Sequence, residues 1–324
     1  MKQAQFVALR RERWEEYQQL LKTLRTRRSK HTPPAEFPRH YRRLCNDLAL
    51  ARTRGYSLSL VHQLQQWIQQ GHAFLYQPQA SLAGDIRRFF QHEFPALVRS
   101  EGPLVLLCSI LFFGPILWLF WYIGHSPEFV YRVLSPDMVE RYEEMYARGA
   151  GSGRGAETDV VMFAYYIMNN IGVALRTFAG GLVFGIGSVV ILLFNGTLIG
   201  AVAAHLSYEG YHENFWSFVI GHGALELTAI VLAGVAGARM GLSLLIPGPF
   251  TRLDALRLSA RRSVKLLYGV MAMLFLAAGL EAFWSASAAP VNVKYFVGGG
   301  LWLLVIAYFT MAGRNHFNRH EHAD

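Results

Sequence analysis

Apolar residues follow two different patterns along the chain. Over residues 1–100 they recur three or four positions apart between charged residues, a period that predicts amphipathic helices. Beyond residue 100 they form runs of roughly 20, each long enough to cross a bilayer. The two patterns predict an all-α protein, with a cytoplasmic basic helical region over 1–100 and a polytopic transmembrane domain over 101–324.

Turn-forming residues divide the first region. Thr32-Pro33-Pro34 breaks the first amphipathic helix, and Gly55 and Gly71 are expected to end the second and the third. The expected helices cover 4–28, 36–54 and 58–71, and a fourth begins near Ser81.

The apolar runs predict about six transmembrane helices. One run, 160–178, is ambiguous because it contains Asn169, Asn170 and Arg176, so its pattern allows either a short span or a helix at the membrane surface. The six expected spans are 103–124, 160–178, 179–205, 215–246, 265–285 and 295–313.

Loop charge favours the six-span count. Segment 247–265 carries five basic residues against Asp254 alone, and residues 1–100 hold 17 of the 31 Lys and Arg but 7 of the 22 acids. Basic segments remain in the cytoplasm, so an even number of spans must separate these two. We therefore expect both termini to be cytoplasmic and the acidic hairpin 206–214 to lie outside.

The polar stretch after the first span is expected on the outer side. Ser135-Pro136-Asp137 is a typical helix start, with a capping hydroxyl, a proline in the first turn and an acid at the positive end of the helix dipole. This pattern predicts an extracytoplasmic helix near 135–148 that lies on the membrane surface.

Composition agrees with a membrane location. The chain is 52% hydrophobic and 16% charged, against about 25% charged residues in soluble domains. A net charge of +9 fits anionic lipid at the cytoplasmic face, so the expected partner is the lipid bilayer and not nucleic acid. Residues 1–30 lack an apolar core, so no cleavable signal peptide is expected.

Polar side chains inside the apolar runs are the candidate functional cluster. His222 and Glu226 stand four residues apart and share one helix face. Such groups can form a proton or ion path, hold a metal, or tie helices together structurally. The candidates are Asn169, Asn170, Arg176, Asn195, His222, Glu226 and Glu281.

The sequence offers little for catalysis. The zinc-protease helix signature needs two histidines, and catalytic zinc uses three protein ligands, whereas His222 and Glu226 leave the third ligand unidentified. No Gly-x-Ser-x-Gly nucleophile elbow is present. No catalytic residue, metal or cofactor is therefore expected, and the protein is predicted not to be an enzyme.

Small residues recur in the membrane domain at the spacing that lets helices pack closely in lipid. The expected helix-packing glycines are Gly181, Gly185, Gly196, Gly200, Gly221, Gly223, Gly237 and Gly241. Because these glycines offer surfaces for close helix contact, we expect a two-fold homodimer, the commonest closed symmetry.

Three motifs carry a family resemblance: Met168-Asn169-Asn170-Ile171, Phe194 to Gly200, and His222 to Leu227. Together with N-terminal motifs such as His72-Ala73-Phe74-Leu75-Tyr76, they make the chain resemble the stage II sporulation protein M family, in its longer type from bacteria that do not sporulate. One departure is Gly221, which stands where that family usually has proline.

The resemblance implies a bacterial inner-membrane scaffold or assembly protein of a cell-envelope complex. It also implies partners among MoxR-type AAA ATPases and cell-wall-related membrane proteins. Two alternatives come from other classes: a transporter or channel that uses the intramembrane His222–Glu226 pair, and a membrane-embedded metal hydrolase.

Overall fold

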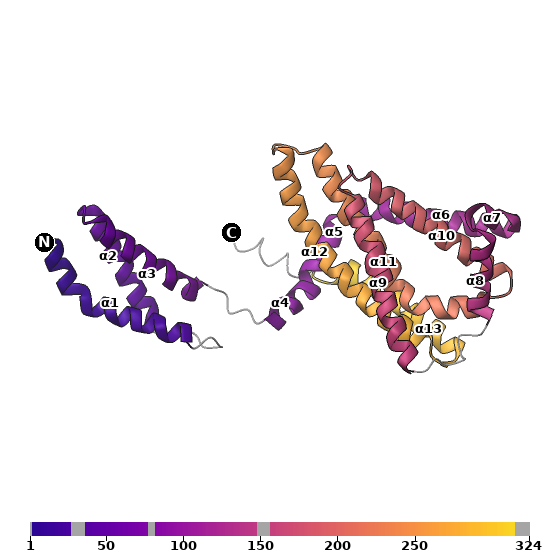
Figure 1. The fold of residues 1–324 in the computed structure, drawn as a ribbon, viewed down its shortest axis with the longest axis horizontal. Coiled ribbons are helices and arrows are strands. Elements are labelled where there is room, and N and C mark those ends of the chain that lie inside the picture. Colours follow the sequence, from indigo (N-terminus) through magenta and orange to yellow (C-terminus); the bar gives the residue numbers. More distant parts are fainter. Residues whose placement is uncertain (1, 27–35, 77–81, 148–155, 315–324) are drawn as a thin grey trace. The chain divides into compact units, whose positions relative to one another are not determined.

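A computed structural model gives the fold (Figure 1) and describes residues 2–26, 36–76, 82–147 and 156–314. The chain divides into two compact units, Met1–Asp85 and Ile86–Asp324, and each is considered by itself. The described part is helical throughout and contains no strand, as the sequence patterns predict.

The N-terminal unit is a set of three amphipathic helices around an aromatic core. Trp14 and Arg10 both bond the buried carboxylate of Asp47, at 3.0 Å from the indole Nε1 and 2.5 Å from the guanidinium. This pairing ties the first helix to the second. The helices are α1 (Gln3–Thr26), α2 (Phe37–Thr53) and α3 (Leu58–Tyr76).

The expectation that Gly71 ends the third helix is wrong. Helix α3 continues through Gly71 to Tyr76. A Cβ at Gly71 would overlap the hydroxyl of Tyr17, whose ring packs across this position. The glycine therefore serves close packing between α3 and α1 and is not a helix stop.

The second unit holds the membrane helices. Its elements are α4 (Leu82–Arg88), η1 (Phe89–Glu93), α5 (Phe94–Ser100), α6 (Gly102–His125), η2 (Pro127–Phe129), α7 (Val130–Val133), α8 (Pro136–Ala147), α9 (Ala156–Gly180), α10 (Ile186–Tyr208), α11 (His212–Leu245), α12 (Arg252–Gly279), η3 (Leu280–Ser285) and α13 (Val291–Met311). Helix α4 begins in the first unit, at the division between the two.

Five of the described helices are long and apolar enough to cross a membrane: α6, α10, α11, α12 with η3, and α13. The ambiguous segment 160–178 lies within α9, which is not among these five. The asparagines that made this segment ambiguous in the sequence lower its apolar character here as well.

Helix directions nevertheless require α9 to traverse the bundle. Gly196 of α10 faces Phe112 of α6, and Gly200 faces Ile116. Residue numbers therefore increase in the same direction along both helices, so the two helices are parallel. The chain must therefore return between them. Helix α9 makes that return, because its 25 residues reach about 37 Å and end at the turn before α10.

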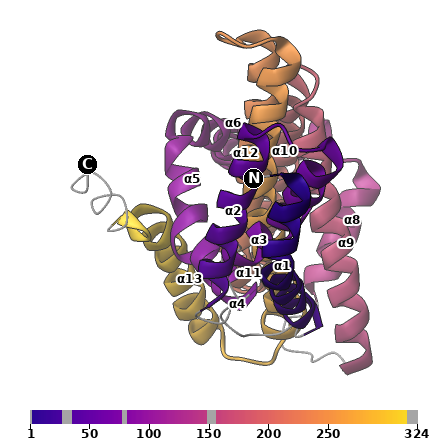
Figure 2. The same cartoon turned by 90° about the vertical axis from the view of Figure 1, so that its left-hand side faces the viewer.

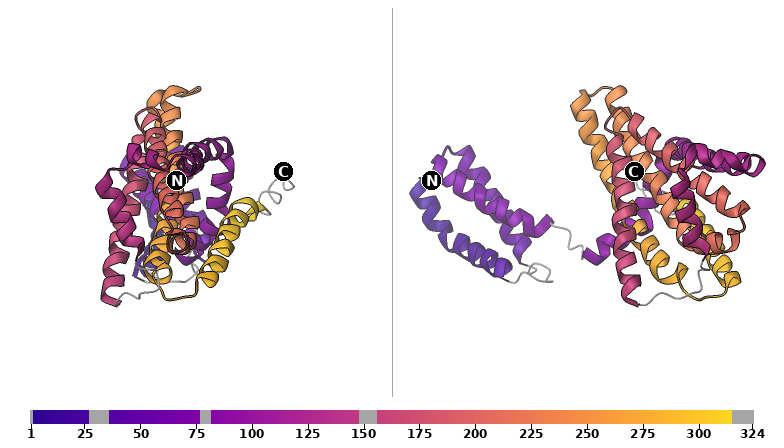
Figure 3. Two further views of the ribbon diagram at one scale, coloured as in Figure 1. Left: turned by 90° about the vertical axis from the view of Figure 1, so that its right-hand side faces the viewer. Right: turned by 45° about the vertical axis from the view of Figure 1, so that its right-hand side comes forward.

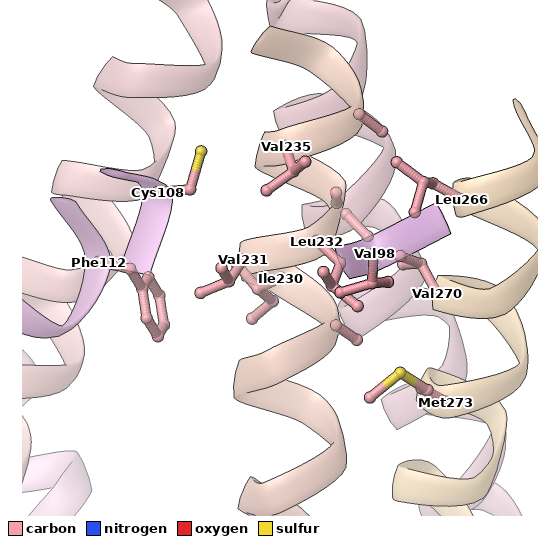
Figure 4. Close-up of a cluster of buried hydrophobic side chains, with 14 of the residues drawn as sticks. Val98, Cys108, Phe112, Ile230, Val231, Leu232, Val235, Leu266, Val270 and Met273 are labelled. Atoms are coloured by element: carbon pink, nitrogen blue, oxygen red, sulfur yellow. The ribbon is translucent and has the colours of Figure 1, made fainter. Parts of the chain in front are cut away.

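Helix α11 is the centre of the bundle. It packs against α6, α9, α10, α12 and α13, and Figures 2 and 3 show α9 and α13 flanking it on opposite sides. Figure 4 shows its apolar contacts, in which Val231 and Val235 lie between the α6 side chains and those of α12. A buried cluster thus joins the helices around one central element.

The expected span over 179–205 begins later than predicted. Residues 181–185 form a turn and α10 starts at Ile186, because Gly185 has a φ of 83° that favours glycine. A Cβ at Gly241 would overlap main-chain atoms of this turn, at Gly181, Phe184 and Gly185, and a Cβ at Gly181 would overlap the backbone of Gly237. The small residues therefore allow three helix ends to meet.

Glycines expected at a dimer interface are used inside the chain. Gly181 meets Gly237, Gly241 meets Gly185, and Gly196 meets Phe112. Their close contacts are intramolecular, so they no longer motivate self-association. The homodimer stays a prediction with no support from these positions.

The basic segment extends a membrane helix. Helix α12 begins at Arg252, earlier than the expected span at 265–285, because the Thr251 hydroxyl accepts a hydrogen bond from the Asp254 amide and caps the helix. The basic residues therefore lie on a helical extension of the span.

The bundle has a basic end and an acidic end. The basic end contains the start of α6, the α9–α10 turn and the start of α12. Arg239 of α11 connects two of these parts: its side chain pairs with Glu101, just before α6, and its carbonyl accepts a hydrogen bond from the Ser259 hydroxyl of α12. The acidic end contains α8, whose Glu143 lies 2.7 Å from His205 of α10. Helix α8 covers the stretch for which a surface helix was predicted.

We predict that Gly200→Ala destabilises the bundle whereas Gly114→Ala does not. A Cβ at Gly200 would lie 2.7 Å from Ile116 Cα, while nothing described lies within 4 Å of the corresponding point at Gly114. Overpacking of this kind costs about 1–3 kcal/mol. Thermal unfolding in detergent measures both variants, and equal melting temperatures would contradict parallel packing of α6 and α10.

We predict that the basic end faces the cytoplasm. In a background with Cys45 and Cys108 replaced by serine, Arg257→Cys should react with a membrane-impermeant thiol reagent only after the inner membrane is opened, because basic segments are retained inside. Glu209→Cys, at the acidic end, should react in intact spheroplasts. Labelling of position 257 from the outer side would contradict this orientation.

Candidate functional site

Two membrane elements bring three metal-ligand-type side chains together. His222 and Glu226 lie on consecutive turns of α11, and Glu281 lies on η3. One ligand atom from each lies within 4.8 Å of the others, and the His222 Nε2 to Glu226 Oε2 distance is 4.0 Å. Glu281 is therefore the third ligand-type residue, which the sequence left unidentified.

A π-helical segment positions Glu281. Segment η3 continues α12 with a wider turn, which shifts the side chains that follow relative to an α-helix. It presents Ser285 to α11, where the Ser285 hydroxyl lies 3.0 Å from His222 Nδ1. Gly221 allows this approach, since a Cβ there would lie 3.3 Å from Trp284.

The Ser285 contact assigns the two ring nitrogens of His222 different roles. With Nδ1 bonded to the Ser285 hydroxyl, Nε2 faces Glu226. His222 is only 5% exposed, so its two ring nitrogens depend on protein partners. A neutral ring protonated at Nδ1 leaves the lone pair of Nε2 directed at the carboxylate side.

Helix α9 adds amide groups to the site. Asn170, 3% exposed, lies beside Glu226, and the Asn169 amide nitrogen donates to the Asn170 Oδ1 at 3.1 Å. Asn170 therefore carries the contact between α9 and α11, while Asn169 holds its amide in place from the exposed side of the helix.

Two further groups border the cluster. Tyr146 of α8 is half-buried near Glu281 and Glu226, and desolvation, followed by the charge of the Glu281 carboxylate, raises the pKa of its phenol above its ordinary value. Lys294 of α13, 2% exposed, donates to the Ser285 carbonyl at 2.8 Å. The cluster is thus bounded by five elements: α8, α9, α11, η3 and α13.

Several buried polar atoms at the site lack a hydrogen bond within the described part of the chain. They are Glu226 Oε2, Asn170 Nδ2 and Trp284 Nε1. Buried polar atoms in folded proteins nearly always have a partner, so each of these calls for an explanation. The site therefore has both a carboxylate oxygen and N–H donors available for additional bonds.

Two predicted members of the cluster lie elsewhere. Arg176 is exposed on α9, near the basic end, where a long side chain can reach the membrane surface. Asn195 donates to the Ile191 carbonyl at 2.8 Å, within its own helix.

Gly223, one of the expected helix-packing glycines, has only ordinary contacts, all with its own helix, so it does not mediate close packing between helices.

Sequence reasoning missed Ser285, Trp284, Lys294 and Tyr146. A lysine near the start of an apolar run was a usable signal for Lys294, because such a charge must find a partner. The other three had no signal, because their position depends on the π-helical turn and on where α8 docks.

These features define a class: an α-helical, multi-pass membrane protein with an enclosed polar cluster in its bundle. The Stage II sporulation protein M (SpoIIM) family model matches residues 108–286, more than half of the chain, and the chain belongs to this family. That family is not known as enzymatic. A second model, Domain of unknown function (DUF8413), matches residues 4–77. No curated protein and no solved structure matches the chain.

We predict that Ser285→Ala lowers stability more than Ser287→Ala. Loss of the Ser285 hydroxyl removes the hydrogen bond that joins buried His222 of α11 to η3, which costs about 0.5–1.5 kcal/mol. The Ser287 hydroxyl donates to the Trp284 carbonyl and accepts from the Ala289 amide at 3.5 Å, both within three residues of it in the sequence, so it joins no two helices. Unfolding in detergent compares the two, and a Ser285→Ala melting temperature equal to that of Ser287→Ala would remove the His222–Ser285 bond from the account.

Proposed function

We propose that the protein is a non-enzymatic scaffold of the bacterial inner membrane that assembles or anchors a cell-envelope complex. The observation that supports this best is the burial of most members of the polar cluster. His222, Asn170, Ser285 and Lys294 are each at most 5% exposed, and they bond across helices. Such groups fix helix packing, as a rigid platform requires.

The two units divide the proposed work. The membrane unit anchors the protein, with both termini in the cytoplasm if the basic end faces inward. The N-terminal unit offers a basic, separately folded set of helices to cytoplasmic partners. The partners that we propose are a second copy of the chain and a MoxR-type AAA ATPase or a cell-wall-related membrane protein.

Transport is the second candidate function. Glu226 supports it, because intramembrane carboxylates often line ion or proton paths and its Oε2 atom has no hydrogen-bond partner in the described structure. In that case ionisation of Glu226 is part of the activity, whereas a scaffold needs only its shape and hydrogen bonds. The two functions therefore differ in how they respond to removal of the charge.

Substitution of Glu226 separates these functions. Glutamine keeps the shape and most hydrogen bonds, so for a scaffold Glu226→Gln should remain closer to the wild type than Glu226→Leu. Leucine places an apolar side chain beside the buried Asn170 side chain and His222 Nε2 and offers them no polar group, and a buried polar group left unsatisfied costs about 1–3 kcal/mol. The measurements are thermal stability in detergent and complementation of an envelope-stress phenotype in the deletion strain.

The outcomes divide as follows. A Glu226→Gln variant that is stable but inactive would contradict the scaffold and favour transport. Full activity and stability of both variants would show that Glu226 is not central to the function. Crosslinking in native membranes, followed by mass spectrometry, then tests whether envelope proteins accompany the wild type.

A further inference from the structure

The geometry points to a zinc site formed by His222 and Glu226 of α11 and Glu281 of η3, a site with a structural role inside the membrane bundle. The three candidate ligand atoms lie within 4.8 Å of one another. They come from two different elements, so a bound ion would join α11 directly to the end of α12. This inference goes beyond the scaffold and does not depend on it.

The ligand chemistry fits zinc better than the hard cations. Zinc accepts imidazole nitrogen and carboxylate oxygen at about 2.0–2.2 Å, in a tetrahedron whose edges are about 3.3 Å. Calcium and magnesium favour sets made entirely of oxygen. The candidate ligand atoms lie within 4.8 Å of one another, with 4.0 Å between His222 Nε2 and Glu226 Oε2, so rotation of the flexible carboxylates has to shorten these separations to complete the set.

His222 is already arranged as a ligand. Its Nδ1 is held by the Ser285 hydroxyl, and its Nε2 faces the carboxylates. Metal-bound histidines ordinarily bond their second nitrogen to an oxygen in this way, which fixes the ring and its tautomer. The Ser285 contact thus does for His222 what an outer-shell partner does in known metal sites.

Unpartnered polar atoms are a second, independent indication. Glu226 Oε2 is buried, has no hydrogen bond among the described residues and lies 4.0 Å from His222 Nε2. The Asn170 amide nitrogen, also without a partner in the described structure, belongs to a residue that is only 3% exposed and lies beside Glu226. A metal-bound carboxylate ordinarily has a hydrogen-bond donor of this kind as its outer-shell partner.

Charge balance also favours an ion. Two carboxylates and a neutral imidazole within a membrane bundle are unfavourable if both carboxylates are ionised, because like charges at this separation repel strongly when desolvated. A divalent cation balances both.

Metal content of the purified protein tests the inference. The full chain, with a histidine-free affinity tag, is purified in mild detergent, loaded with zinc, desalted and measured by mass spectrometry of the elements. We expect close to one zinc per chain. Glu281→Gln and His222→Gln should each lower retained zinc at least about tenfold, since loss even of an outer-shell partner costs about 10–100-fold in affinity.

Two controls locate the metal. His205→Gln removes another buried histidine that faces a carboxylate, Glu143, but it lies outside the three-residue cluster, so it should keep its zinc. Replacement of the tail histidines His316, His320 and His322 by alanine should also keep it. Loss of zinc in the tail variant with retention in Glu281→Gln would overturn the assignment.

A variant-free measurement decides the result if substitutions impair folding. X-ray absorption at the zinc edge of the wild type should show a shell of nitrogen and oxygen with one imidazole. Chelation should lower the melting temperature, and zinc, but not magnesium, should restore it. A wild-type protein that retains no zinc after loading, or a shell with sulfur or several imidazoles, would overturn the inference.

Discussion

An ionisable side chain between membrane helices must be satisfied by other parts of the protein, because lipid offers it no partner. Helix α11 carries two such residues, His222 and Glu226, at the centre of the bundle. Their partners come from α9 through Asn170 and from η3 through Ser285 and Glu281. This requirement holds α9, which is not itself strongly apolar, against α11, and the π-helical end of α12 carries the partners Glu281 and Ser285.

Close backbone approach supplies the second constraint. Dispersion replaces the hydrophobic drive between helices in lipid, so contact at short range carries much of the stability. Gly196 and Gly200 let α10 lie along α6, and Gly181, Gly237 and Gly241 let three helix ends meet near the basic end. The two halves of α11 thus differ: close packing of glycines dominates the C-terminal half, and hydrogen bonds between polar side chains dominate the N-terminal half.

The sequence predicted the architecture well because its signals are local. Apolar run length defined most of the spans, whereas loop charge favoured a sixth span over 160–178, which lies in α9, a helix that is not among the five long and apolar enough to cross a membrane. The sequence-based prediction misplaced the helix ends at Gly71 and near 179, because a glycine can end a helix, form a turn or allow close packing, depending on its neighbours. The same ambiguity made Gly181 and Gly237 resemble a dimer surface.

The site was only half predictable for a related reason. The spacing of His222 and Glu226 on one helix is visible in the sequence, whereas Glu281 joins them through the wider turn of η3. No periodic rule places Ser285 against His222, and Arg176 looked like a partner because it is close along the chain. Which groups meet depends on helix direction and rotation, and these follow from packing.

A double-mutant cycle between Glu226 and Glu281 tests most directly whether the polar cluster is one connected unit. Unfolding free energies in mixed micelles are compared for Glu226→Gln, Glu281→Gln and the double variant. Side chains in one network couple by about 0.5–3 kcal/mol, whereas independent sites add to within about 0.3–0.5 kcal/mol. The account predicts clear non-additivity. Additive effects would show that α11 and η3 are not joined through these carboxylates.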